Sequence, residues 1–301
     1  MVKIKLDFEK IALALFFLML LYIGPGSVFD RSIVHSFPYG YYASDAFQHQ
    51  VRAESIKDAG NFRYEASYIS QGFEKTIGRY PPSIYHISVI FSYLAGIETY
   101  DSIYFIVFFF AVIGVLVMYF VIRDFSRNAA LMSLPLAMLA FSHPSLIGFT
   151  WGHWPSVLAQ SFLILFFWCI TKINLEKSYF LAAMVFSSIA LVHTSESFFG
   201  LIFIGLFFGV RAVTGSLKKA ELKKIMLALS LFFAVSLYYL IIFKYTWAKG
   251  QPYSFFAMPV WEGNPGFYMA NFGLLLAFIA TGILLALFKL NGMHASLIAA
   301  Y

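Results

Sequence analysis

Three polar side chains whose types suit a functional site lie close together near the N-terminus of the chain. Asp45, His49 and Arg52 are spaced by four and three residues, so a helix carries all three on one face. A carboxylate, an imidazole and a guanidinium can together bind a metal ion, accept a proton or bind a phosphate group. The alternative is a surface helix that makes ordinary polar contacts between successive turns.

Two further histidines lie in a short polar segment between apolar ones. His143 precedes Pro144, and His153 lies in the sequence WGHWP. Pro155 suits the first turn of a following helix, whose positive N-terminal end favours an anionic ligand. The alternative is a turn in an aromatic belt whose histidine is satisfied by its neighbours.

The sequence HTSE joins two closely spaced apolar segments. Either Thr194 or Ser195 is predicted to be the N-cap of the second helix, and Glu196 in the first turn suits the helix dipole. The functional alternative is that His193 and Glu196 bind a metal ion or support its ligands.

The elements that must position these residues are set by an unusually apolar composition. Sixty per cent of the 301 residues are hydrophobic, only 12% are charged, and the mean hydropathy is +0.77. Soluble domains carry about 25% charged residues, so we expect an all-α, polytopic transmembrane bundle. The net charge of +6 is explained by lysines between apolar segments rather than by a nucleic-acid partner. The lone cysteine, Cys169, excludes an intrachain disulfide and a cysteine metal site.

Hydropathy predicts about eight crossings within a single domain that spans residues 1–301. The first segment lacks a small-residue cleavage site, so it is expected to remain as an uncleaved helix. A long first outer loop, residues 25–102, is too aromatic for disorder and is expected to form juxtamembrane helices. The predicted spans cover residues 11–29, 103–122, 129–148, 154–173, 178–193, 195–212, 225–247 and 269–289.

The segment 80–97, which begins YPP, decides the orientation of everything after it. If it does not cross and the N-terminus is cytoplasmic, most of the 21 basic residues lie inside. If it crosses, the lysine cluster 218–224 lies outside, against the positive-inside rule. We therefore predict a juxtamembrane or re-entrant helix, which brings the ionisable side chains near the span ends to the outer face. These are His35, Asp45, His49, His86, His143, His153, His193, Glu196 and Glu262.

The order and spacing of these motifs resemble the GT-C superfamily of polytopic membrane glycosyltransferases. The sequence DAFQHQVRAESI is similar to the acidic motif in the first loop of oligosaccharyltransferases. The sequence GRYPPSIYHI is similar to the Pro-Pro helix of protein mannosyltransferases. The resemblance covers residues 10–212 in layout, with specific motifs at 44–60, 78–87 and 150–156.

The resemblance implies transfer of a sugar from a polyprenyl-phosphate-linked donor to an acceptor at the outer face of the cell membrane. Asp45 corresponds to the carboxylate of the first loop, which acts as catalytic base or metal ligand. Asp45 and His49 are therefore the predicted catalytic residues. Arg52, Arg79 and Tyr80 are then expected near the donor phosphate.

The resemblance also implies a divalent metal ion, Mg or Mn, which Asp45 and His153 would hold. His153 departs from the family pattern, because many relatives have an acidic residue there. The residues expected to orient the catalytic and metal-binding side chains are His143, His193 and Glu196.

Two other classes of function remain open from the sequence. A non-catalytic GT-C-like subunit that binds lipid or a partner protein fits the absence of a second acidic residue beside Asp45. It also fits the short segment after Lys289, which is typical of a truncated or minimal relative. A transporter is less favoured, because transporters tend to carry charges in mid-bilayer and these spans carry almost none. The expected partners are the lipid bilayer, the sugar donor and other membrane subunits.

Overall fold

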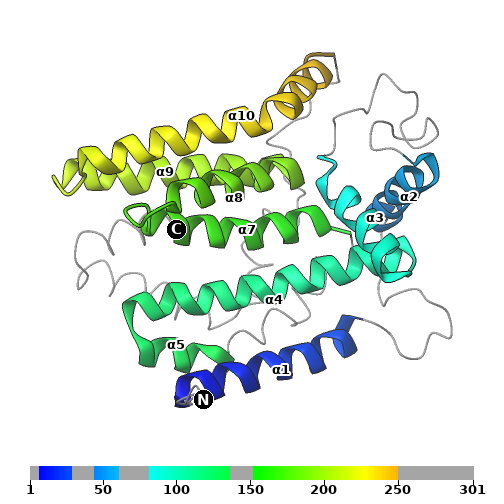
Figure 1. The fold of residues 1–301 in the computed structure, drawn as a ribbon, viewed down its shortest axis with the longest axis horizontal. Helices are drawn as coiled ribbons and strands as arrows, with labels where there is room; N and C mark the ends of the chain where they lie inside the picture. The colour runs from blue at the N-terminus through cyan, green and yellow to red at the C-terminus, as the bar shows by residue number, and fades with distance from the viewer. Residues whose placement is uncertain (1–6, 29–43, 61–80, 136–151, 250–301) are drawn as a thin grey trace, which may run out of the picture.

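The computed structural model describes residues 7–28, 44–60, 81–135 and 152–249, and within these ranges every regular element is helical. The helices pack side by side as a bundle, with α2 and α3 gathered at one end (Figure 1). In chain order they are α1 (Phe8–Val28), α2 (Ser44–Ala59), α3 (Ser83–Ala95), α4 (Thr99–Phe125), α5 (Arg127–Ser133), α7 (Trp154–Thr171), α8 (Ser178–Val192), α9 (Thr194–Val213) and α10 (Lys219–Lys249).

Four stretches in these helices are long and apolar enough to cross a bilayer, which identifies a multi-pass membrane protein. They are Thr99–Phe125, Trp154–Thr171, Ser195–Val213 and Lys219–Ile241. The apolar helix α8 has 15 residues and is shorter than these four, so the crossing predicted at 178–193 stays a prediction. Within the predicted span 129–148 the structure describes residues up to 135, and the span 269–289 lies outside the described residues.

Helix α3 lies beside α2 over its whole length. His49 near the start of α2 is bonded to Tyr85 near the start of α3, and the Tyr93 hydroxyl donates to the Lys57 carbonyl near both ends. The 13 residues of α3 span about 20 Å, less than the roughly 30 Å of a hydrocarbon core. Helix α3 is thus shorter than the four candidate spans, and its juxtamembrane placement stays a prediction.

Helix α7 is the centre of the bundle and packs against α4, α8 and α9. Its aromatic side chains stack on those of its neighbours, with ring centroids 4.7 Å apart for Phe166 and Phe186 and 3.9 Å apart for Phe167 and Phe203. Gly200 lets α9 approach closely, because a Cβ there would lie 2.6 Å from the Phe186 ring. This dense packing fixes the helices relative to one another, and with them the polar segments at their ends.

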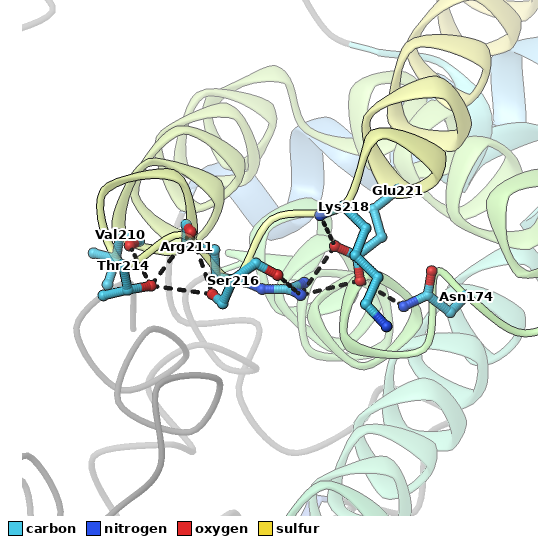
Figure 2. Close-up of polar contacts among 7 residues, drawn as sticks. All are labelled: Asn174, Val210, Arg211, Thr214, Ser216, Lys218 and Glu221. Atoms are coloured by element: carbon cyan, nitrogen blue, oxygen red, sulfur yellow. Dashed lines mark hydrogen bonds and ion pairs between the residues drawn. The ribbon is translucent and has the colours of Figure 1, made fainter.

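At the end opposite α2 and α3, the turn between α9 and α10 is closed by a buried ion pair (Figure 2). Arg211 donates to Glu221 at 2.9 Å, and Glu221 is fully buried. Glu221 also accepts from the Asn174 side chain at 2.5 Å and from the backbone N–H of Lys218 at 3.0 Å. Because Asn174 belongs to the α7–α8 turn, this clamp joins both turns at this end of the bundle.

The start of α9 differs from the prediction. His193 is its N-cap residue, in extended backbone, and no side chain caps the helix by a hydrogen bond. The prediction that Thr194 or Ser195 is the N-cap is therefore wrong. The Glu196 carboxylate is bonded to His193 and Ser156, so its partners lie across the helix junction and on α7.

Candidate functional site

Several of the candidate residues meet at the end of the bundle that carries α2 and α3 (Figure 1). The structure confirms a helix over Ser44–Ala59, and this helix packs against α3 and α4. His49 and Arg52 are only 4% and 3% exposed, and Asp45 is half-buried. The polar face of α2 therefore faces the protein, which excludes the alternative of a solvated surface helix.

The turn before α7 lies directly against the start of α2. Gly152 has a φ of +79°, a backbone conformation that L side chains rarely adopt. A Cβ at this position would lie 2.2 Å from the Ala46 nitrogen and 2.7 Å from the Asp45 carbonyl carbon. Only glycine allows this approach, which brings Asp45 next to the His153 segment although the two are far apart in sequence.

The His49 ring contacts residues of two other segments. Its Nδ1 lies 2.7 Å from the Tyr85 hydroxyl, and the ring also hydrogen-bonds the backbone of Gly152. Its ring centroid lies 5.7 Å from that of Tyr85 and 5.8 Å from that of Trp154. His49 thus links α2, α3 and the start of α7, and its ring is oriented by all three.

The environment of His49 keeps its imidazole neutral. The pKa of His49 is lowered to about 3, mainly because burial disfavours the charged ring. The nearby charge of Arg52 and those of His193 and His153 lower it further, whereas the bond to the Gly152 backbone opposes the shift. The predicted catalytic role of His49 stays a prediction.

A second polar chain connects α7 to the α8–α9 junction. The Ser156 hydroxyl donates to Glu196 at 2.6 Å, and the other oxygen of Glu196 is bonded to Nδ1 of His193. Glu196 is 4% exposed, whereas His193 is half-buried. A buried carboxylate bonded to one imidazole nitrogen orients the ring, so that the other nitrogen can exchange a proton or bind an anion.

The metal-binding candidates at this end of the bundle include Asp45, His153 and His193. Within the described ranges, no three His, Cys, Asp or Glu side chains form a group that could hold a metal ion. The described residues therefore do not by themselves provide a ligand set, and metal binding by Asp45 and His153 stays a prediction.

Three of the predicted site residues cannot be placed. Arg79, Tyr80 and His143 lie outside the described residues, as do His35 and Glu262. The described part of the site consists of Asp45, His49, Arg52, His153, His193 and Glu196.

Three further residues of the site were not singled out from the sequence. Tyr85 and Ser156 bind His49 and Glu196, and Gly152 makes the close approach to α2. Tyr85 follows the Pro-Pro motif, and Ser156 follows Pro155 in the first turn of α7. Proximity to these motifs was the available signal in the sequence. The contacts themselves were not predictable, because Tyr85 is 36 residues from His49 and Ser156 is 40 residues from Glu196.

Comparison with known proteins found no matching family model, curated protein or solved structure.

Proposed function

We propose that the chain is a membrane glycosyltransferase that moves a sugar from a polyprenyl-phosphate-linked donor to an acceptor at the outer face of the membrane. One observation carries the proposal. Ionisable side chains from α2, the start of α7 and the α8–α9 junction gather at one end of an apolar bundle. Polar residues that converge at a membrane interface are typical of a functional site.

The orientation proposed for this site has the N-terminus in the cytoplasm and about eight crossings. The charges near the other end support it, because that end carries a cluster of lysines in the α9–α10 segment. The short α3, packed along α2, fits a loop that returns to the same side.

The proposed reaction is displacement at the anomeric carbon of the donor. The acceptor oxygen forms a bond to this carbon while the bond from the carbon to the phosphate oxygen breaks, and the phosphate leaves with the electron pair. Asp45 takes the acceptor proton. Arg52 and Arg79 balance the charge of the departing phosphate, to which His193, oriented by Glu196, donates a hydrogen bond.

The role of Asp45 is tested with purified protein, radiolabelled polyprenyl-phosphate sugars extracted from membranes, and the release of polyprenyl phosphate as readout. Asp45→Asn removes the proton acceptor at nearly constant volume, and we expect a loss of turnover of at least about 100-fold. Asp58→Asn is the matched control, because Asp58 is an exposed carboxylate near the other end of the same helix. It should retain full turnover.

Wild-type turnover together with undiminished turnover in a folded Asp45→Asn protein would refute the role of Asp45. No turnover by the wild type with any donor in the extract would refute the transferase proposal itself.

A non-catalytic lipid-binding subunit is the second candidate function. The observation that favours it is that His49, a predicted catalytic residue, is buried and hydrogen-bonded to Tyr85 and the Gly152 backbone. In that case purified protein would retain polyprenyl phosphate without turning over the linked sugar. A transporter is less favoured, since the charged residues of the four described spans all lie near span ends. These residues are Asp101, Arg123, Asp124, Glu196, Arg211, Lys219, Glu221, Lys223 and Lys224.

A further inference from the structure

The end of the bundle opposite the proposed site carries a basic surface. Lys177, Lys218, Lys219 and Lys223 are exposed there, and within the described ranges no acidic side chain forms an ion pair with any of them. We name these four residues the basic surface.

The acidic residues nearby are already neutralised by other partners. Glu221 is fully buried and bonded to Arg211, Asn174 and the backbone of Lys218 (Figure 2). Asp124 is paired with Lys172 at 2.7 Å and accepts from Trp168. The positive charge of the basic surface is therefore not cancelled within the described protein, apart from the exposed Glu176 next to Lys177.

The Arg211–Glu221 clamp also fixes the geometry of this surface. Lys219 begins α10 and Lys218 directly precedes it, and Lys177 lies in the α7–α8 turn three residues after Asn174. The Lys224 ammonium donates to the Asn174 carbonyl at 2.7 Å, so the two turns are joined at two points. The lysines thus come from a rigid platform rather than from independent loops.

One face of α10 passes directly from charged to apolar residues. Lys219, Leu222, Lys223 and Met226 follow the i, i+3, i+4, i+7 spacing, so they share a face of the helix. Leu222 and Met226 are 49% and 57% exposed, and the two lysines are exposed as well. An anionic lipid has a complementary order, with a charged headgroup that matches the lysines and acyl chains that match the apolar side chains.

We propose that the basic surface binds the phosphate headgroups of anionic phospholipids, with the acyl chains lying along the exposed apolar face of α10. This site is independent of the glycosyltransferase proposal, because its residues lie at the opposite end of the bundle. The lysine ammonium groups bind the headgroup phosphate. The Arg211–Glu221 clamp keeps the two turns that carry these lysines next to each other.

The test is native mass spectrometry of the chain released from nanodiscs of equimolar phosphatidylcholine and phosphatidylglycerol. We expect the wild type to retain phosphatidylglycerol in several-fold excess. The variant Lys218→Gln/Lys219→Gln/Lys223→Gln should lose that excess, and the corresponding triple arginine variant should keep it. Lys57→Gln is the matched control, because Lys57 lies at the other end and pairs with Glu98.

Circular dichroism of each variant establishes that the helices are intact, and the arginine variant distinguishes charge from fold. Equal retention of the two lipids by the wild type would overturn the proposal. The same excess in the glutamine variant, or an equal loss in Lys57→Gln, would also overturn it.

Discussion

The best-defined residue of the site is His49, whose ring contacts two other segments. Its two partners, Tyr85 and the Gly152 backbone, come from α3 and the turn before α7. A neutral, buried imidazole at this junction couples the start of α2 to the rest of the site. Its protonation state therefore matters for stability as well as for geometry.

The pKa of His49 predicts how stability changes with pH. The folded-state pKa of about 3 lies below the ordinary value of 6.5, so between these values the unfolded chain binds the extra proton. The stabilisation is complete above pH 6.5 and is lost as the pH falls toward 3, with a slope approaching about 1.4 kcal/mol per pH unit. We expect the free energy of unfolding of the wild type to fall more steeply between pH 7 and pH 5 than that of His49→Gln.

Denaturant titrations in detergent micelles at pH 7, 6 and 5 measure this difference. Asp58→Asn serves as a control for general effects of a polar substitution on α2, and should follow the wild type. Parallel pH profiles for the wild type and His49→Gln would show that the imidazole is not held neutral.

At the scale of elements, the bundle depends on joints between helix ends, and the Arg211–Glu221 clamp is the most buried of these. Removing one member of a buried ion pair leaves the other charge unpaired in an apolar environment. The clamp also serves three segments at once: the end of α9, the start of α10 and the α7–α8 turn.

We therefore expect Glu221→Met to lower the free energy of unfolding by about 3 kcal/mol. The double variant Arg211→Met/Glu221→Met should lose less than Glu221→Met alone, because it leaves no unpaired charge in the clamp. Glu176→Gln is the matched control, since this exposed acid lies at the same end of the bundle. Denaturant titration in micelles is the measurement, and an additive double variant would contradict the expected coupling.

The sequence predicted the elements better than the joints between them. Hydropathy located α4, α7, α8, α9 and α10, and the residue spacing on α2 identified its polar face. Pro155 was placed correctly in the first turn of α7. These features depend on periodicity and on local backbone rules, which a single sequence carries.

The contacts that assemble the site depend on tertiary packing instead. Tyr85 and His49 meet because α3 lies along α2, and Ser156 and Glu196 meet because α7 packs against α9. Neither pair has a local sequence signal. The predicted N-cap residue of α9 was wrong for a related reason. The HTSE sequence fits a local capping pattern, whereas Glu196 is bonded to His193 and to Ser156 on another helix.

At the scale of the whole molecule, the described side chains at the two ends of the bundle carry opposite net charge. Among the described side chains, the site end has more acids than bases, and the clamp end has more bases than acids. The site end carries Asp45, Glu54, Asp58, Glu98, Asp101 and Glu196 against Arg52 and Lys57. The clamp end carries Lys10, Arg123, Arg127, Lys172, Lys177, Arg211, Lys218, Lys219, Lys223 and Lys224 against Asp7, Glu9, Asp124, Glu176 and Glu221.

This asymmetry predicts the orientation of the protein, because basic residues in short loops remain on the cytoplasmic side. The clamp end should then face the cytoplasm, where anionic headgroups are available to the basic surface. The site end should face outward, where a polyprenyl-linked donor is accessible to Asp45 and His193. Both proposals therefore predict the same sidedness from different residues.

The most direct test of the account is cysteine labelling in intact cells with a membrane-impermeant maleimide. Cys169 is buried and is the sole cysteine, so Cys169→Ala provides a clean background. Asp58→Cys on α2 and Ala220→Cys on α10 then report the two ends, since both positions are exposed. We predict that Asp58→Cys is labelled in intact cells and Ala220→Cys only after permeabilisation; labelling of both from outside, or the reverse pattern, would contradict the orientation on which the proposed site depends.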